Sequence, residues 1–328
     1  MNNTTSRRHF LSTLGAAGMG FSAGISLLQA EAWGAPQPKP GSKIIAFSKA
    51  FQKSSPTQTA DIVAEVGWDG IDCPVRPKGQ IEPERVEEEL PRMVEALAKV
   101  GREVTMISTD ILKVDPQAEK VLRTVSKLGI KRYRMDYWKY DTSRPIPEQI
   151  AEVRAANRDL AALNKELGIC GGYQNHSGAQ YVGAPIWDIY ETIKDCDPQY
   201  LGTCFDIAHA TIEGGLSWPI EARLMRPFFT AVFVKDYVWK KGIKKTKGKT
   251  KSASKPVEEW RPEWCPLGEG MVNPEFFQTL MASGYDGPIE QHHEYEVGTG
   301  EAMIKAMQKD LAVLKQWLGS AHKERYGI

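Results

Sequence analysis

The sequence Tyr200-Leu201-Gly202-Thr203-Cys204-Phe205-Asp206-Ile207-Ala208-His209 contains the pattern on which the fold assignment depends. Its first half, Tyr200 to Phe205, is typical of a buried β-strand, and the acid Asp206 and the histidine His209 follow directly. In parallel α/β folds the carboxyl ends of the strands and the loops after them form the functional face. An Asp at this place can also cap the next helix, so the pattern by itself leaves both interpretations open.

Polar residues of the same kind follow other apolar runs in the chain. They are Gln174-Asn175-His176, Lys235-Asp236 and Glu290-Gln291-His292. Because the carboxyl ends of parallel strands meet at one face, this recurrence favours a shared functional site over a set of unrelated helix caps.

Short apolar runs alternate with longer helical periods about eight times along the chain. The expected strands are Ile44 to Phe47, Gly70 to Cys73, Val104 to Ile107, Lys131 to Met135, Ile169 to Tyr173, Tyr200 to Phe205, Ala231 to Val234 and Pro288 to Gln291. The expected helices lie near Thr57 to Val66, Pro83 to Val100, Pro116 to Leu128, Pro147 to Leu167, Ile186 to Lys194, Trp218 to Met225, Pro274 to Ser283 and Glu301 to Leu318. Eight such units predict a single-domain (β/α)8 TIM barrel over residues 43–320, with a doubly wound open sheet as the lesser alternative and 321–328 as a C-terminal tail.

The boundaries of these helices are well marked. Asp115-Pro116 and Asn273-Pro274 each supply a cap residue and a proline for the first turn. Several helices are expected to end at glycines in a left-handed conformation, each followed by a strand: Gly67, Gly101, Gly129, Gly168 and Gly284.

Composition excludes some classes of function. Lys and Arg total 42 against 41 Asp and Glu, so the chain has no overall field that would attract nucleic acid or an acidic membrane. The five cysteines include no Cys-x-x-Cys pair, which argues against a zinc site built on them.

The N-terminus carries an export signal. Ser6-Arg7-Arg8-His9-Phe10-Leu11 is a twin-arginine element, and a weakly apolar run from Leu14 to Leu28 and small residues suited to cleavage follow it. We therefore expect residues 1–35 to be a cleavable signal peptide, 36–42 to be a linker, and the protein to be exported to the periplasm through the twin-arginine machinery.

A lysine-rich stretch, Lys240 to Lys255, follows the seventh expected strand. A solvated loop is the default interpretation of such a run. Its place on the functional face also allows a lid or an anion-attracting rim.

A family resemblance is carried by the motifs Gln174-Asn175-His176, Phe205-Asp206-Ile207-Ala208-His209, Phe233-Val234-Lys235-Asp236 and Gly284-Tyr285-Asp286-Gly287. These motifs resemble those of the xylose isomerase-like barrel superfamily, the sugar phosphate isomerases/epimerases that include inosose dehydratase and tagatose 3-epimerase, and the resemblance is most specific in the carboxyl half. The resemblance covers about Lys43 to Leu318. It implies one divalent metal (Mn, Zn or Co), held by Glu, Asp, His and Glu from successive strand ends, and no nucleotide cofactor.

Only part of that ligand set matches. The first family glutamate falls on Gln174 and the family histidine on Phe233, whereas the Asp-x-x-His motif is intact at Asp206 and His209. The last glutamate falls on His292, with Glu290 and Glu294 two residues to either side. Fewer carboxylates lower the expected affinity for a divalent cation. The metal ligands that the resemblance still allows are Gln174, Asp206 and His292.

The same substitutions change the expected chemistry. Gln174 has no proton equilibrium near neutral pH, so it cannot be one of two bases. We expect His292 or Glu290 to abstract a proton next to a carbonyl, with Lys235 or a metal stabilising the enolate. The substrate-binding residues that the resemblance implies are Asn175, His176, His209 and Asp236.

The sequence thus predicts an exported sugar isomerase, epimerase or lyase that acts on a small carbohydrate, with single-base isomerisation or elimination favoured over two-base epimerisation. A nucleic-acid repair enzyme is disfavoured, because the chain has neither a basic surface nor enough histidines for a multi-metal site. The alternative from another class is a barrel that binds a carbohydrate or a partner without catalysis. The oligomeric state is not predicted.

Overall fold

The computed structural model describes residues 41–244 and 257–326, so the predicted signal peptide, residues 36–40 of the predicted linker and residues 245–255 of the lysine-rich stretch lie outside it. Its strands form a closed barrel in the order β1-β10-β7-β6-β5-β4-β3-β2, with every pair parallel. They are β1 (Ile44–Phe47), β2 (Gly70–Val75), β3 (Glu103–Thr109), β4 (Arg132–Arg134), β5 (Cys170–Gln174), β6 (Leu201–Asp206), β7 (Phe229–Val234) and β10 (Ile289–Gln291). The predicted TIM barrel and all of its predicted strands are confirmed.

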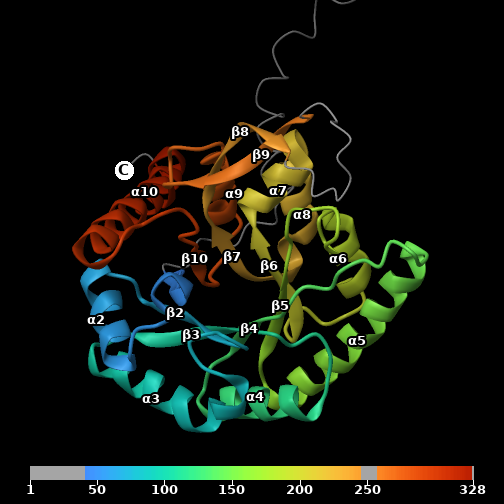
Figure 1. Cartoon of the computed structure of the whole chain (residues 1–328), viewed down its shortest axis with the longest axis horizontal. Coiled ribbons are helices and arrows are strands. Elements are labelled where there is room, and N and C mark those ends of the chain that lie inside the picture. Colours follow the sequence, from blue (N-terminus) through green and yellow to red (C-terminus); the bar gives the residue numbers. More distant parts are fainter. Residues whose placement is uncertain (1–40, 245–256, 327–328) are drawn as a thin grey trace, which may run out of the picture.

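Helices surround the barrel (Figure 1). They are α2 (Pro56–Val66), α3 (Val86–Lys99), α4 (Pro116–Lys127), α5 (Ile146–Leu167), α6 (Ile186–Ile193), α7 (Ile207–Gly214), α8 (Trp218–Met225), α9 (Glu275–Ala282) and α10 (Gly300–Tyr326), with short 3-10 turns between some of them. The Asp115 side chain accepts a hydrogen bond from Ala118 N at 2.8 Å and caps α4 as predicted. The five predicted terminal glycines all have φ between 65° and 95°.

The sequence did not predict α7 as a separate element. Asp206 ends β6 and at once caps α7, because its side chain accepts hydrogen bonds from Ala208 N and His209 N. One carboxylate therefore joins strand and helix with no loop between them.

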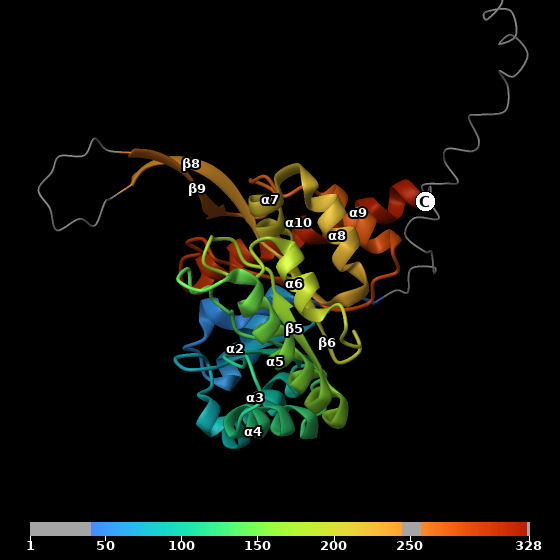
Figure 2. The same cartoon turned by 90° about the vertical axis from the view of Figure 1, so that its right-hand side faces the viewer.

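The largest departure from the sequence prediction is an antiparallel hairpin. The strands β8 (Asp236–Lys244) and β9 (Val257–Cys265) pair throughout and project from the barrel (Figure 2). The first part of the stretch predicted as a loop is thus β-structure, while residues 245–256 are outside the described residues. Lys240, Lys241 and Lys244 give the end of β8 the charge of a solvated loop, which hid its strand character in the sequence.

Close backbone approach explains the glycines of β5. A side chain added at Gly172 would meet Cys204 Sγ at 2.5 Å, and one added at Gly171 would meet the Tyr133 ring at 2.7 Å. The barrel interior is filled by a small apolar layer of Ile45, Met106, Cys204, Ala231 and Phe233. This layer separates the two ends of the barrel and forms the floor of the carboxyl-end face. No helix in the described ranges is long and apolar enough to cross a membrane.

Candidate functional site

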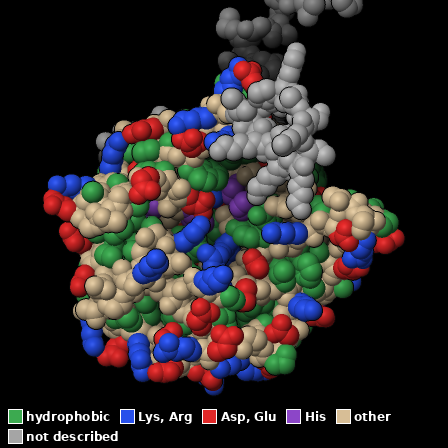
Figure 3. Space-filling view, viewed as in Figure 1, with side chains coloured by type: hydrophobic (Ala, Val, Ile, Leu, Met, Phe, Trp, Pro, Cys, Tyr) green, Lys and Arg blue, Asp and Glu red, His purple; other side chains and the backbone are tan. Residues whose placement is uncertain are grey.

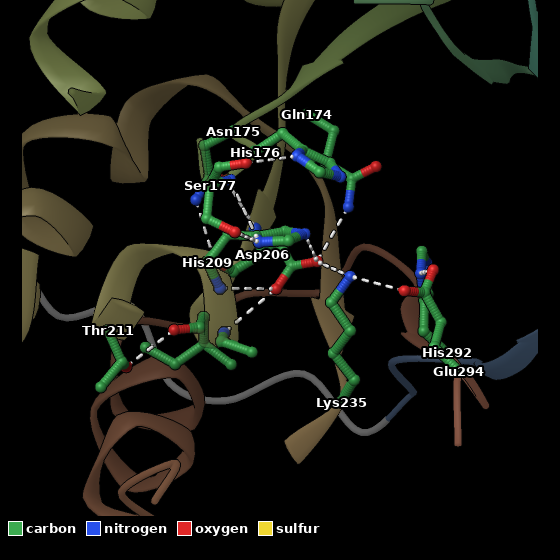
Figure 4. Close-up of polar contacts among 12 residues, drawn as sticks. Gln174, Asn175, His176, Ser177, Asp206, His209, Thr211, Lys235, His292 and Glu294 are labelled. Carbon is green, nitrogen blue, oxygen red and sulfur yellow. Dashed lines mark hydrogen bonds and ion pairs between the residues drawn. The ribbon is translucent and has the colours of Figure 1, made fainter. Parts of the chain in front are cut away.

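Polar side chains converge at the carboxyl ends of four strands. Gln174 ends β5, Asp206 ends β6, Lys235 follows β7 and His292 follows β10. Their side chains point toward one another (Figure 4), and Figure 3 shows basic and histidine side chains near the centre of one face of the molecule. The fold thus brings together residues that lie more than a hundred positions apart.

Asp206 is the centre of this cluster and is fully buried. Its Oδ1 accepts hydrogen bonds from Ala208 N (3.0 Å) and His209 N (3.1 Å). Its Oδ2 accepts one from Gln174 Nε2 (2.8 Å) and lies 3.2 Å from Lys235 Nζ. Burial alone would raise the pKa of Asp206, but Lys235, His209 and His292 outweigh it and lower the pKa to about 2. The carboxylate is therefore ionised at neutral pH.

The orientation of the Gln174 amide is fixed by its partners. Its Oε1 accepts hydrogen bonds from Arg134 Nη1 (3.0 Å) and from the Tyr137 hydroxyl, while its Nε2 donates to Asp206. An arginine can only donate and an ionised aspartate can only accept, so the amide cannot be flipped. A carboxylate at this position would face Asp206 with like charge, which explains physically why an amide suits the site.

Lys235 holds an ammonium inside the cluster, with its side chain only 3% exposed. Nζ lies 3.2 Å from Asp206 Oδ2 and 3.6 Å from Glu294 Oε2. It also lies 4.4 Å from the centre of the Trp264 ring, within cation-π range. The ammonium is therefore bracketed by two carboxylates and covered by an aromatic face.

Glu294 is the acidic residue of the cluster that reaches solvent, with 23% of its side chain exposed. Burial would raise its pKa, but Lys235 and His292 hold the pKa well below its ordinary value, so Glu294 is ionised. The sequence had placed Glu294 only as a neighbour of His292. The structure puts its carboxylate beside Lys235, although β10 has already ended at Gln291.

His292 is enclosed between the rings of Phe47 (4.9 Å) and Phe233 (4.6 Å), and its side chain is 1% exposed. Nδ1 lies 3.9 Å from Glu294 Oε1 and Nε2 lies 2.8 Å from Glu290 Oε1. Burial lowers the pKa of His292 to about 4, so the ring is neutral at pH 7. His292 can take part in proton transfer only through Glu294 or Glu290, because it does not reach solvent.

Glu290 lies deeper in the barrel than the sequence prediction assumed. It is fully buried next to the carboxyl of Asp72, and burial together with Asp72 raises its pKa well above the ordinary value. The predicted role of Glu290 as a base does not agree with this environment, because a protonated carboxyl cannot accept a proton. Beside it, Ser108 links Asp72 to Arg134 through two hydrogen bonds.

The rings of His209 and His176 lie in contact, with their centres 4.1 Å apart and their planes tilted by 34°. His209 Nδ1 accepts a hydrogen bond from Ser177 N (3.1 Å), so the neutral ring carries its proton on Nε2, which lies 3.8 Å from Asp206 Oδ2. Burial and Lys235 lower the pKa of His209 well below its ordinary value. His176 is half-buried and its Nδ1 is 2.9 Å from Ser177 O. Both rings therefore line the cluster as neutral groups.

Asn175 and Asp236, predicted to bind substrate, are engaged by the backbone. Asn175 donates from Nδ2 to Asp206 O (2.9 Å) and accepts from Asp206 N (2.8 Å). Asp236 accepts hydrogen bonds from the backbone N–H groups of Tyr237, Gly268, Gly270 and Val272. These hydrogen bonds to the backbone hold the neighbouring segments in place. That Asn175 and Asp236 also contact a substrate stays a prediction.

The predicted metal ligands do not fit a metal ion. The oxygen of Gln174 is used by Arg134 and Tyr137, so its NH2 group faces the position that a cation would need. His292 is enclosed between two phenylalanine rings. Across the described parts of the chain, no three His, Cys, Asp or Glu side chains are grouped so that they could hold a metal. No step of the chemistry below is therefore assigned to a metal.

A cavity of about 410 Å³ opens beside the cluster, between β9 and the segment after β10. Glu294 and Trp264, which both contact Lys235, form part of its wall together with Arg261, Pro262, Glu263, Tyr295 and Glu296. A second cavity of about 390 Å³ lies at the other end of the barrel, near Lys43 and Arg132. The first is the candidate substrate site because it meets the carboxyl-end cluster.

Sequence reasoning missed several inward-facing residues. They are Asp72 on β2, Ser108 on β3, Arg134 on β4 and Tyr137 after β4. A usable signal was present, because Asp72 and Arg134 are charged residues within predicted buried strands, where charges are rarely tolerated unless they are paired.

Comparisons with known proteins agree with this architecture. Residues 60–317 match the family model described as xylose isomerase-like TIM barrel. A 3-keto-D-glucoside 4-epimerase from E. coli is 16% identical with a TM-score of 0.61, covering 84% of this chain and 99% of its own. A D-tagatose 3-epimerase-like protein is 17% identical with a TM-score of 0.64, covering 86% and 99% respectively. A xylose isomerase-like TIM barrel protein from Mycobacterium smegmatis, solved in complex with magnesium, is 16% identical with a TM-score of 0.60, covering 85% and 97%.

No curated protein matches the chain significantly. The structural likenesses show the fold, and the family match extends over most of the barrel. Together they support an enzyme of the isomerase and epimerase class. The closed parallel barrel, the polar cluster at its carboxyl end and the match over residues 60–317 lead to one conclusion: the chain belongs to the xylose isomerase-like TIM barrel family.

Proposed function

We propose that this protein is an isomerase or lyase that acts on a sugar or keto-sugar by moving a proton next to a carbonyl group. The family assignment and structural neighbours described as sugar epimerases support this class of substrate. The substrate would enter the cavity beside Glu294 and Trp264, where an aromatic ring and charged groups suit a polyhydroxylated ligand.

The observation that carries the proposal is the pair formed by Glu294 and Lys235. An ionised carboxylate on a cavity wall can accept a proton from carbon, and an ammonium beside it can donate a hydrogen bond to the carbonyl oxygen. These two groups are what enolisation requires. Glu294 thus takes the role of base that the sequence had assigned to His292 or Glu290.

A single base favours isomerisation or elimination over two-base epimerisation. The group across the cluster from Glu294 is Gln174, whose amide cannot exchange a proton near neutral pH. A second-base role would fall to His176, which is half-buried and whose Nδ1 lies 2.9 Å from Ser177 O. Under our proposal His176 does not serve as that base. The stereochemistry of the product tests this, because a second base would invert the exchanged carbon.

The test is the exchange of a substrate C–H proton for deuterium in D2O, followed by NMR over a panel of ketohexoses and 3-keto-glucosides. We expect the wild-type protein to catalyse exchange on at least one of them. The exchange rate of Glu294→Gln should be at least about 100-fold lower than that of the wild type, because general-base catalysis contributes roughly 10²–10⁴-fold. The matched control is Glu296→Gln, since Glu296 is an exposed glutamate on the same cavity wall.

A Glu294→Gln variant that exchanges the proton at the wild-type rate would contradict the assignment of Glu294 as the base. Binding of a panel sugar without any exchange would instead favour the non-catalytic carbohydrate-binding barrel. Full exchange accompanied by inversion at the exchanged carbon would favour a two-base reaction with His176.

We also propose that the protein is exported by the twin-arginine route. The support is the arginine pair Arg7-Arg8, the weakly apolar run from Leu14 to Leu28 and the small residues that follow it. An exported enzyme meets few phosphorylated sugars, and the cavity wall pairs the basic Arg261 with three glutamates, which does not favour an anionic phosphate. Neutral sugars are therefore the preferred substrates in this proposal.

A further inference from the structure

We propose that the ammonium of Lys235 occupies the electrostatic role of a divalent cation at the centre of the site, so that this barrel polarises its substrate without a bound metal. The proposal rests on the proposed function for its chemistry. Its principal test measures metal binding and does not depend on any activity.

The first support is the charge balance around Lys235. One positive charge lies between two carboxylates, at 3.2 Å from Asp206 and 3.6 Å from Glu294. Two further neighbours of the Asp206 carboxylate are the Gln174 amide, with Nε2 at 2.8 Å, and the His209 ring, with Nε2 at 3.8 Å. Two anions beside an ammonium are a poor site for a further divalent cation, because the ammonium repels it and, among the described residues, no three His, Cys, Asp or Glu side chains are grouped to hold one.

The second support is the occupancy of the donor atoms. Both oxygens of Asp206 already accept hydrogen bonds, Oδ1 from two backbone N–H groups and Oδ2 from Gln174 Nε2. A cation at Oδ2 would have to displace Lys235 and turn the amide of Gln174. The turned amide would then leave Arg134 and Tyr137 without their acceptor inside the barrel. Binding a metal therefore breaks the hydrogen bonds that fix the Gln174 amide between Arg134, Tyr137 and Asp206.

The third support comes from β7. Phe233 and Lys235 are two residues apart and point to the same side of the strand, into the barrel. Phe233 is fully buried and its ring lies 4.6 Å from that of His292. The strand thus offers an apolar ring and an ammonium at this end, and neither can ligate a metal.

The reaction balances without any other cofactor. The C–H proton next to the carbonyl passes to Glu294, and the C–H electron pair becomes the carbon–carbon double bond of an enediolate. The carbonyl π pair moves onto oxygen, where the Lys235 N–H groups donate hydrogen bonds. The former carbonyl oxygen then takes up the proton of the hydroxyl on the adjacent carbon, whose oxygen becomes the new carbonyl. Glu294 returns its proton to the former carbonyl carbon, which gives the isomer. The Trp264 ring, 4.4 Å from Nζ, covers Lys235 on another side and helps to hold it in place.

The experiment measures metal in the full-length protein purified without chelator, by mass spectrometry, together with Mn²⁺ titration by calorimetry. We expect less than about one tenth of a metal ion per chain and no change in melting temperature on adding EDTA or Mn²⁺. The triple variant Gln174→Glu, Phe233→His, Lys235→Met restores two potential ligands, at positions 174 and 233, and removes the ammonium. It should bind Mn²⁺ at least about 100-fold more tightly than the wild type.

Two controls separate the charge from the fold. Lys139→Met removes an exposed lysine outside the cluster and should leave Mn²⁺ binding as in the wild type. Lys235→Arg keeps the positive charge and should also remain free of metal, which guards against loss of folding in Lys235→Met. Failure of the triple variant to bind Mn²⁺ while it remains folded would contradict the claim that these three positions exclude the metal.

Stoichiometric Mn, Zn or Co in the wild type that is lost in Asp206→Ala would overturn the proposal. That result would leave the proposed reaction intact, because deuterium exchange and its loss in Glu294→Gln are measured separately. Conversely, a metal-free protein that catalyses no deuterium exchange would contradict the proposed function. The inference that Lys235 takes the place of the cation would stand.

Discussion

At the scale of single residues, the site depends on groups whose charge is set by burial and by one neighbour. Asp206 stays ionised because Lys235 lies 3.2 Å away, whereas burial, together with the neighbouring carboxyl of Asp72, raises the pKa of Glu290 well above its ordinary value. Two acids at the same end of one barrel therefore differ in protonation. The position of a buried cation decides which of them can act on a substrate.

Asp206→Asn should destabilise the fold by about 2 kcal/mol at pH 7, since one pKa unit corresponds to about 1.4 kcal/mol. The folded-state pKa of Asp206, about 2, lies below the ordinary value of 3.8. The stabilisation is therefore fully present above about pH 4 and is lost as the pH falls from 4 through 2. Urea unfolding of both proteins across pH 2–7 measures this difference.

The control for that series is Asp61→Asn, which changes an exposed aspartate on α2. It should change the free energy of unfolding by less than about 0.5 kcal/mol. If the difference in free energy of unfolding between wild type and Asp206→Asn stayed constant from pH 7 down to pH 2, folding would not lower the pKa of Asp206. Stabilisation of the ionised carboxylate by Lys235 would then be contradicted.

At the scale of elements, the joint between β7 and β8 decides how the hairpin leaves the barrel. Asp236 sits at this joint, is 1% exposed and accepts four backbone hydrogen bonds, three of them from the segment 268–272. A side chain at Gly270 would collide with the Asp236 carboxylate, so a glycine is needed there. The hairpin and the segment after it are thus fastened to the barrel by one side chain, which in turn places Trp264 over Lys235.

Asp236→Ala should cost about 3 kcal/mol or more, because hydrogen bonds to a charged group each contribute roughly 1.5–3 kcal/mol. Amide hydrogen exchange at Gly268, Gly270 and Val272 should speed up more than exchange in the barrel strands. Hydrogen-exchange mass spectrometry together with thermal unfolding tests this expectation.

The matched control is Glu269→Ala in the same segment. Glu269 pairs with Lys309 at 2.6 Å, but both side chains are at least half exposed, so its loss should cost less than about 1 kcal/mol. Equal exchange of the 268–272 amides in both variants would mean that Asp236 does not hold the segment.

At the scale of the whole molecule, the charges nearly cancel and the chemistry gathers at one end of the barrel. Nothing in the overall charge draws the protein to a polyanion, so its partners are set by the local cluster and by the N-terminal element. Under our proposal of export, that element determines the compartment, and with it the sugars that the site meets.

Changing Arg7 and Arg8 to lysine should block export, because twin-arginine transport recognises the arginine pair. We expect the uncleaved precursor to collect in the cytoplasm, while the wild-type protein appears in the periplasmic fraction with an N-terminus near residue 35. Cell fractionation followed by mass spectrometry of the intact protein measures both. Arg85→Lys with Arg92→Lys, two exposed arginines of the barrel, should leave export unchanged. Periplasmic protein at the wild-type level in the Arg7 and Arg8 variant would contradict the twin-arginine assignment.

The sequence by itself determined the barrel and the end at which its site lies. The periodicity of the apolar runs, the glycines with positive φ and the cap at Asp115 are local signals, and the structure confirms them. The hairpin β8–β9 escaped prediction, because its lysines made a strand resemble a solvated loop. Gln174, Asp206, Lys235 and His292 were located correctly at neighbouring strand ends, since parallel strands present their carboxyl ends together.

Only the tertiary structure decided which of these groups are ionised, which are paired with one another and which face solvent. The partners of Gln174 come from β4 and β6, and the partner of Glu290 comes from β2, so no spacing along the chain could indicate them. Glu294 gained its role because the chain turns after β10 and brings its carboxylate to Lys235. Protonation and exposure depend on neighbours in space, and in a closed barrel those neighbours come from strands far apart in the sequence.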